Sequence, residues 1–229
     1  RPDAVAGHSG GELAALVVAE VFNPEENLSL LSGTMDALMT REAIDHALLA
    51  VGAPRDELAG VIAAALADGD PEGACVAMDN CPHQSIAVGD AASIAAVESA
   101  AMDKGWLCER LELGRPYHTE RFEQYMAPLR MLFENVEFKA PQLPIYSCTT
   151  GERFPQEPEA IRELALRHWC APVEFTKLID TLHRDGVRVF LEIGPRNNLT
   201  SFVDDILRDR PHLAIPSNRS QRPAVTQLQ

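Results

Sequence analysis

Ser9 lies in a glycine-rich segment, Gly7-His8-Ser9-Gly10-Gly11-Glu12, between a short apolar run at 4–6 and a helical pattern at 13–21. A strand that turns sharply into a helix exposes a serine hydroxyl at the turn, and Gly7 and Gly11 remove Cβ atoms where strand and helix crowd together. The N–H of Gly10 would lie at the helix N-terminus, where backbone donors stabilise an oxyanion. The segment predicts a nucleophile elbow, with a plain glycine-rich turn as the alternative.

Ser9 needs a general base, and the chain has seven histidines as candidates. His118 is the best placed, because Arg115-Pro116-Tyr117-His118-Thr119 has the pattern of a loop that can face the elbow. No acidic third member of a triad is singled out, since several aspartates fit equally well. The other histidines are expected to be structural or at the surface: His8, His46, His83, His168, His183 and His212.

The composition is that of a globular chain that can bury a core, since 46% of its 229 residues are apolar and 24% are charged. The net charge of −14 argues against nucleic-acid or anionic-membrane binding, which reward clustered lysine and arginine. No apolar run reaches the roughly 18–20 residues of a membrane span, and the first residues do not begin a signal peptide, so we expect a cytoplasmic location. The spacing of the five cysteines predicts reduced, mostly buried thiols and no bound metal.

The hydrophobic pattern predicts an α/β fold with an insertion. A second helix is expected at 24–39, after the elbow. Short apolar runs and alanine-rich stretches then follow in the order β-α-β-β-α-β of a ferredoxin-like unit, at 47–52, 55–67, 74–79, 84–88, 91–104 and 106–113. The α/β pattern returns with helices at 122–133, 157–168 and 176–184, a strand at 143–148 and a buried strand at 187–193.

The glycine-rich segment resembles the GHSxGE signature of malonyl-type acyl-CoA:acyl-carrier-protein transacylases, and the resemblance extends over almost the whole chain. Its ordered segments are Gly7 to Glu12, Arg115-Pro116-Tyr117-His118, Pro144 to Gly151, His168-Trp169 with Pro172 to Phe175, and Gly186 to Pro195. The histidine-ended tetrad and Asp79-Asn80-Cys81-Pro82-His83 are most similar to the acyltransferase domains of iterative type I polyketide synthases of the enediyne type.

The resemblance implies an α/β-hydrolase-like subdomain that carries a ferredoxin-like (βαββαβ) subdomain. The first would comprise 1–46 and 115–215, the insertion 47–114, and a C-terminal linker 216–229. The family places a Gly-Gln-Gly strand and several helices upstream of the elbow. We expect this N-terminal part of the fold to be missing from the chain, together with the second oxyanion donor that it supplies.

The implied mechanism uses a Ser–His dyad without a metal or a bound cofactor. Ser9 would accept an acyl group from malonyl-CoA with His118 as base, and pass it to the phosphopantetheine thiol of an acyl carrier protein in a ping-pong reaction. A backbone carbonyl at Arg196 or Asn197 would orient the histidine. The implied partners are the carrier protein, the coenzyme A thioester and neighbouring polyketide synthase domains, with polyketide (antibiotic) biosynthesis as the setting.

The residues expected to bind substrate are His8, Thr34, Asn80, Arg115 and Tyr117. Malonyl-using relatives carry an arginine at the position that the ungapped count places on Thr34, so the carboxylate clamp is missing. A charge-assisted pair of that kind contributes about 1.5–3 kcal/mol. Neutral donors such as Thr34, the guanidinium of Arg115, or an acyl group without a carboxylate are the possible explanations. We favour malonyl, and we expect Arg115 to be a solvated loop residue rather than a clamp.

Two other classes of function use the same residues. A serine hydrolase or thioesterase would pass the acyl group to water, and a non-catalytic docking domain would leave the elbow unused. Acylation of Ser9 separates the docking domain from the two enzymes, and the identity of the acceptor separates the enzymes from each other.

Overall fold

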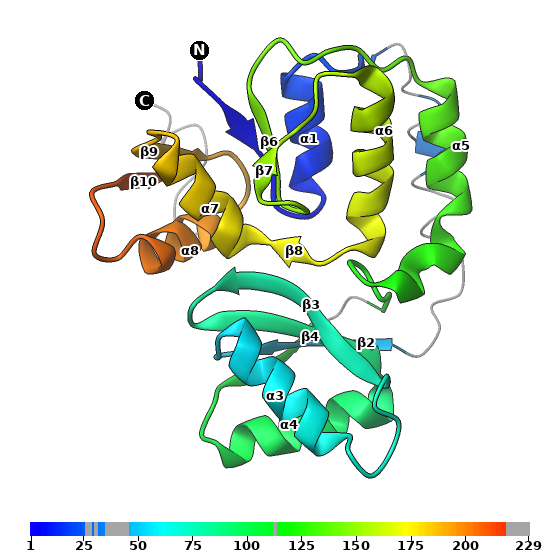
Figure 1. Cartoon of the computed structure of the whole chain (residues 1–229), viewed down its shortest axis with the longest axis vertical. Coiled ribbons are helices and arrows are strands. Elements are labelled where there is room, and N and C mark those ends of the chain that lie inside the picture. The colour runs from blue at the N-terminus through cyan, green and yellow to red at the C-terminus, as the bar shows by residue number, and fades with distance from the viewer. Residues whose placement is uncertain (26–28, 30–31, 35–45, 112–113, 219–229) are drawn as a thin grey trace.

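The computed structural model describes residues 1–25, 29, 32–34, 46–111 and 114–218, and Figure 1 shows them in two layered parts. One part is an open sheet of five strands with helices on both faces. The other is an α/β layer that carries the elbow. The helix expected at 24–39 falls mostly outside the described residues, and so do residues 219–229 of the expected linker.

The five-stranded sheet is built mainly by the segment expected to be ferredoxin-like. Its strand order is β5-β2-β4-β3-β8, and the neighbours among the first four strands are antiparallel. The β-α-β-β-α-β order is the predicted one. The elements are β2 (His46–Val51), α3 (Arg55–Ala65), β3 (Ala74–Cys81), β4 (Gln84–Asp90), α4 (Ala91–Asp103) and β5 (Cys108–Leu111).

Both faces of this sheet are covered, which explains why β4 is an unbroken apolar run rather than an alternating one. Ala87 points to the face that packs on α3 and α4, whereas Ile86 and Val88 point to the opposite core. That opposite core contains α7 (Phe175–Arg184) and α8 (Asn198–Ile206). In Figure 1 the sheet accordingly lies between the two pairs of helices.

The fifth strand, β8 (Val173–Glu174), comes from a distant part of the sequence and pairs in parallel with β3. It directly follows the short 3-10 helix η2 (His168–Cys170) and precedes α7. The chain therefore passes from the α/β layer into the edge of the sheet, and this passage joins the two parts close to the elbow.

The α/β layer contains a three-stranded sheet in the order β1-β6-β7, in which the middle strand β6 lies parallel to β1 and antiparallel to β7. Apolar side chains from α1, α5 and α6 pack together with Ile145 of β6 in one core. The elements are β1 (Val5–Ala6), α1 (Gly11–Val18), α5 (Ala127–Asn135), β6 (Ile145–Ser147), β7 (Glu152–Arg153) and α6 (Pro158–Arg167).

The strand expected at 187–193 is present as β9 (Val189–Glu192), but the expectation that it is buried was wrong. Val189, Leu191 and Ile193 are 61%, 60% and 75% exposed. Within the described residues, β9 pairs only with β10 (Leu213–Pro216), a strand that the pattern did not predict. An apolar run indicates a propensity to form a strand, whereas the burial of that strand depends on which elements pack against it.

Two further expectations need correction. The single helix at 122–133 is a 3-10 helix, η1 (Glu120–Tyr125), followed by α5, because Pro128 has no N–H to continue a helical ladder. All five cysteines are free, but only Cys81 and Cys148 are buried, so the thiols are not mostly buried.

Among the described residues, the helices all fall short of the length and apolarity that a membrane crossing requires.

Candidate active site

The chain makes a tight turn between β1 and α1, and Ser9 sits in it with a left-handed φ of 52°. A Cβ on Gly7 would lie 2.2 Å from backbone atoms of Gly11 and Glu12, so only glycine fits there. A Cβ on Gly11 would meet nothing within 4 Å, and the expected crowding at that end of the turn is absent. The strand, the strained serine and the following helix have the geometry of a nucleophile elbow.

His118 lies opposite the elbow, with its Nε2 2.7 Å from Ser9 Oγ. Its Nδ1 is 3.1 Å from the carbonyl oxygen of His168, and its backbone N–H donates to the carbonyl of Trp169 at 3.0 Å. A carbonyl only accepts, so Nδ1 carries the proton and Nε2 is left to accept the hydrogen of the serine hydroxyl. This tautomer is the one that a general base for Ser9 requires.

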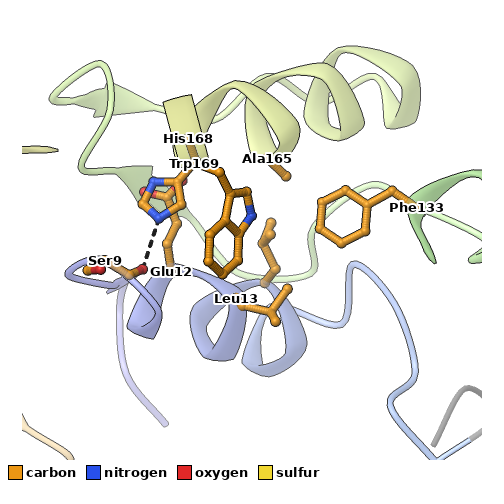
Figure 2. Close-up of a pocket in the computed structure, with 8 residues that line it drawn as sticks. Ser9, Glu12, Leu13, Phe133, Ala165, His168 and Trp169 are labelled. Carbon is orange, nitrogen blue, oxygen red and sulfur yellow. Dashed lines mark hydrogen bonds and ion pairs between the residues drawn. The ribbon is translucent and has the colours of Figure 1, made fainter. Parts of the chain in front are cut away.

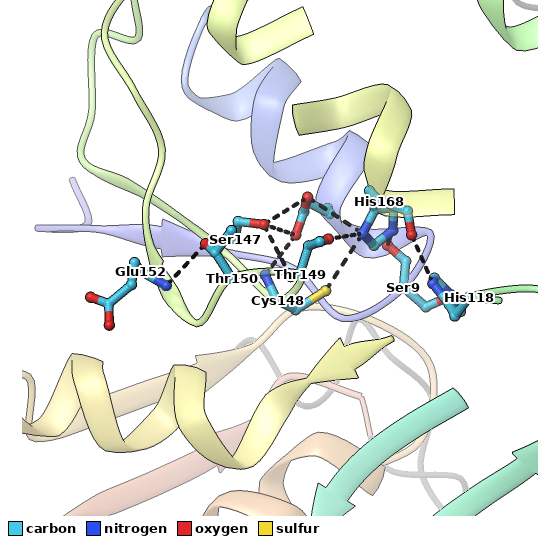
Figure 3. A network of polar contacts seen from close by, with 9 residues as sticks. Ser9, His118, Ser147, Cys148, Thr149, Thr150, Glu152 and His168 are labelled. Carbon is cyan, nitrogen blue, oxygen red and sulfur yellow. Dashed lines mark hydrogen bonds and ion pairs between the residues drawn. The ribbon is translucent and has the colours of Figure 1, made fainter. Parts of the chain in front are cut away.

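The carbonyl that orients His118 was expected at Arg196 or Asn197, and this expectation was wrong. The backbone of Arg196 pairs with Asn218, and the carbonyl of Asn197 accepts from the backbone N–H and the hydroxyl of Ser201. The carbonyl of His168 takes the role because η2 runs directly behind the ring of His118, as Figure 3 shows.

Burial keeps this base neutral. It lowers the pKa of the His118 imidazole to about 4, because a buried cation loses its hydration. The ring therefore holds its accepting lone pair at neutral pH. Gly10 directly precedes the first residue of α1, so its N–H lies at the positive end of the helix dipole, beside Ser9. A serine, a neutral base and a backbone donor together are suited to nucleophilic attack on a carbonyl.

Two buried residues that the sequence did not single out lie directly behind Ser9. Glu12 accepts from the N–H of Cys148 at 2.7 Å and from the hydroxyl of Ser147 at 3.2 Å, and burial raises its pKa to about 7. His168 was expected to be structural or at the surface, yet its Nε2 lies 3.0 Å from the carbonyl of Ser9. Figure 3 shows His168 within the polar network that includes Ser147 and Cys148. Glu12 and His168 both stand in segments that carry the family resemblance, and their place in those segments is the signal that could have found them.

Glu12, Cys148 and His168 are also the described residues whose spacing could suit a metal ion, since their ligand atoms all lie within 4.8 Å of one another. The hydrogen bonds of Glu12 to Cys148 N–H and of His168 to Ser9 already account for this proximity. Burial also raises the pKa of the Cys148 thiol well above its ordinary value, which opposes a thiolate ligand. The donor set therefore fits a hydrogen-bonded network better than a metal centre.

Of the residues expected to bind substrate, His8 and Asn80 are brought together. His8 Nε2 is 2.7 Å from Asn80 Oδ1, and the amide of Asn80 donates to Gln84 at 2.9 Å. This pair links the elbow to β3 and β4, and Phe175 packs edge-on against the His8 ring. The elbow is thus held by the sheet through His8 and by His168 through the carbonyl of Ser9.

The remaining three expected residues are all partly or fully buried. Tyr117 stacks on Phe122 with ring centroids 4.8 Å apart. Arg115 is buried with its guanidinium 5.1 Å from the ring centre of Tyr125, so the expectation of a solvated loop arginine was wrong. Thr34 is buried, and its hydroxyl has no hydrogen-bond partner among the described residues.

A small pocket adjoins Ser9 between α1 and α6 (Figure 2). Its walls are mostly apolar, and none of its lining residues is a lysine or an arginine. The lining residues are Ser9, Glu12, Leu13, Leu16, Phe133, Ala165, His168 and Trp169.

Comparison with known proteins gives a consistent result. The acyl transferase domain family matches residues 1–224. Polyketide synthase GfsB of Streptomyces halstedii is 30% identical over 229 residues, which cover 97% of this chain and 4% of that protein. The acyltransferase domain from the second module of the salinomycin polyketide synthase is 29% identical with a TM-score of 0.84, over 99% of this chain and 52% of that one.

A second similar structure is a malonyl-transacylase in complex with its type II polyketide synthase acyl-carrier protein. It is 24% identical with a TM-score of 0.84, over the whole of this chain and 72% of that one, and shows the same fold. The chain thus spans a small fraction of the synthase and about half of the salinomycin structure. The family match over nearly all of the sequence identifies this chain as a member of the acyl transferase domain family.

Proposed function

We propose that this chain transfers an acyl group, malonyl in the reading that we favour, from coenzyme A to the phosphopantetheine thiol of an acyl carrier protein. The observation that carries the proposal is the 2.7 Å contact between Ser9 Oγ and the Nε2 of a neutral, oriented His118. Membership of the family indicates the class of reaction, and Ser9 and His118 provide the nucleophile and the base that this reaction needs.

The proposed reaction has two matched halves. Ser9 Oγ attacks the thioester carbonyl as its proton passes to His118 Nε2, and the Gly10 N–H stabilises the oxyanion. Collapse of this intermediate breaks the C–S bond, and the departing coenzyme A thiolate takes the proton from His118. In the second half the carrier thiol gives its proton to His118 and attacks the Ser9 ester, and the serine oxygen recovers the proton as it leaves.

Malonyl is proposed as the acyl group although the ungapped count places Thr34 where malonyl-using relatives carry an arginine. Within the described residues, the pocket beside Ser9 has no cationic lining residue that could pair with a malonyl carboxylate. The buried hydroxyl of Thr34, which has no described partner, is a neutral donor of the kind that could replace an arginine. An acyl group without a carboxylate is the alternative.

The acceptor is proposed by analogy with the malonyl-transacylase that was solved with its carrier protein. Carrier proteins are acidic as a rule, and this chain carries a net charge of −14, so docking requires a local cationic surface. Neighbouring polyketide synthase domains are proposed partners on the same ground, because the similar region of GfsB is a small part of a synthase. The enediyne subtype stays a prediction.

The test is an acceptor competition. The protein is loaded with radiolabelled malonyl-CoA and divided between buffer and buffer with a holo carrier protein, and the label is followed on the carrier and in free malonate. The proposal predicts that label moves to the carrier and that an apo carrier, which lacks the thiol, receives none. Release of malonate at the same rate with and without the holo carrier would identify a thioesterase instead.

A further inference from the structure

Ser9 and His118 both have left-handed backbone conformations, with φ values of 52° and 63°. Such a conformation costs a residue other than glycine roughly 1–3 kcal/mol, and it persists only when the surroundings hold it. The same short segment contacts both residues. The carbonyls of His168 and Trp169 accept from the ring and backbone of His118, and the His168 side chain reaches the backbone of Ser9.

The hydrogen bonds of the His168 ring fix where its proton lies. The carbonyl of Ser9 can only accept, so Nε2 carries the hydrogen at 3.0 Å from that oxygen. Burial lowers the pKa of His168 to about 3, so the ring is neutral and its Nδ1 is an acceptor. The Thr149 hydroxyl lies 3.0 Å from Nδ1 and donates to it. Glu12 Oε1 at 3.4 Å and Cys148 Sγ at 3.8 Å also face this nitrogen, so Thr149 provides the shortest of the three contacts.

The elbow helix does not need this contact in order to begin. The carbonyl of Ser9 already accepts the N–H of Glu12 at 2.9 Å, one of the 3-10-type bonds of the tight turn that leads into α1. The imidazole of His168 is a second donor to the same oxygen, and it approaches from a residue 159 positions away in the sequence. Its effect is to restrict the direction of the Ser9 peptide, and with it the direction of Oγ.

We propose that the His168 imidazole is a positioning residue for Ser9, a role separate from that of its backbone carbonyl, which orients His118. Its Nε2–H holds the carbonyl of the strained serine, so that Oγ stays in line with His118 Nε2. The proposal rests on the proposed function, in which Ser9 is the nucleophile. It assigns the Thr149 hydroxyl a supporting role, because that hydroxyl selects the His168 tautomer that has a hydrogen on Nε2.

The test compares two amide variants that differ in where they place the donor. The amide nitrogen of His168→Gln lies near the original Nε2, whereas that of His168→Asn lies near the original Nδ1. Both lose the imidazole and keep the backbone carbonyl. A displacement of about 1 Å in a reacting group lowers the reaction rate by up to about 10²-fold. Labelling of Ser9 by a fluorophosphonate should therefore be about 10- to 100-fold slower in His168→Asn. We expect His168→Gln to stay within about threefold of wild type, since it retains the donor.

A purely structural role would lower both rates together, in step with the thermal unfolding midpoints, and that result would overturn the proposal. Two unchanged rates would overturn it as well. If His168→Asn does not fold, Thr149→Val provides the second measurement, because it keeps the imidazole but removes the shortest hydrogen bond to Nδ1. It should slow labelling by about 2- to 10-fold, the value of one hydrogen bond, and an unchanged rate would contradict the proposal.

The fluorophosphonate also separates this inference from the proposed function. A wild-type Ser9 that reacts with the probe but with neither malonyl-CoA nor acetyl-CoA would refute the acyltransferase while the ratio of the two amide variants still decides the role of His168. A wild-type Ser9 that reacts with none of the three compounds would overturn both.

Discussion

The ring of His118 lies 5.0 Å from the ring of His168 at an interplanar angle of 70°, and the carbonyl of His168 accepts a hydrogen bond from His118 Nδ1–H. Two imidazoles this close disfavour each other's charged forms, which adds to the effect of burial on the pKa of His168. The site therefore has a base that is neutral because of its surroundings, rather than a base charged by an acidic partner.

This arrangement predicts an unusual pH dependence for acylation of Ser9. The neutral form of His118 is the active one, and burial lowers its pKa from 6.5 to about 4. The acylation rate should therefore stay near its plateau as the pH falls from 7 to about 5, and reach half of it near pH 4. Single-turnover acylation across this range checks the prediction, with circular dichroism to show that the protein remains folded. A midpoint near 6.5 would show an exposed, ordinary histidine.

The raised pKa of the Glu12 carboxyl predicts that the stability of the protein also depends on pH. Burial raises the pKa of this carboxyl from 4.5 to about 7 in the folded protein, so the folded state binds more protons than the unfolded state between those values. The stability linked to this group is full below pH 4.5 and is lost as the pH rises through 7. Glu12→Gln removes the ionisation. As the pH rises through this range, the unfolding free energy of the variant should therefore increase relative to that of wild type by about 1–3 kcal/mol.

Urea unfolding of both proteins at several pH values from 4.5 to 8 measures this difference. Burial lowers the pKa of His118 to about 4 and that of His168 to about 3, so both rings are neutral in the folded proteins over this range and do not contribute to the difference. A difference between the two proteins that does not change with pH would mean that Glu12 is ionised in the folded state throughout.

The glycines of the elbow offer a matched pair of alanine substitutions. Gly7→Ala places a Cβ 2.2 Å from backbone atoms, whereas Gly11→Ala places one in open space within a helix. We expect Gly7→Ala to destabilise the protein by several kcal/mol or to prevent folding, as severe overpacking of backbone does. Gly11→Ala should be neutral or should stabilise by about 0.5–1 kcal/mol, because alanine favours the helix. Thermal unfolding distinguishes them, and equal effects would refute the close approach at Gly7.

Thr34 provides a test of acyl specificity. Its hydroxyl is buried without a hydrogen-bond partner among the described residues, so Thr34→Val should leave stability within about 1 kcal/mol of wild type. If the hydroxyl binds the malonyl carboxylate, the variant loses a hydrogen bond to a charged group, worth about 1.5–3 kcal/mol, or about 10- to 100-fold in kcat/KM for malonyl-CoA. The kcat/KM for acetyl-CoA should not change. Equal losses for both substrates would remove Thr34 from carboxylate recognition.

The parts of the structure that could be predicted are those with local signatures. The order of strands and helices in 47–113 follows from hydrophobic period and turn residues, and Ser9 and His118 follow from motifs. The role of His168 could not be predicted in this way, because it depends on contacts with Ser9 and His118, 159 and 50 residues away in the sequence. A backbone carbonyl has no sequence signature at all, which is why Arg196 and Asn197 were the wrong choice. The exposure of β9 depends in the same way on packing that an apolar run does not encode.

Intact-protein mass spectrometry after rapid mixing with malonyl-CoA shows whether Ser9 forms an acyl-enzyme with His118 as its base. We expect a single malonyl adduct on wild type and none on Ser9→Ala. On His118→Ala the adduct should form about 10²- to 10⁴-fold more slowly, the usual contribution of a general base. A malonyl adduct of the same size and rate on Ser9→Ala would refute Ser9 as the nucleophile, because the acyl group would then reside on another residue.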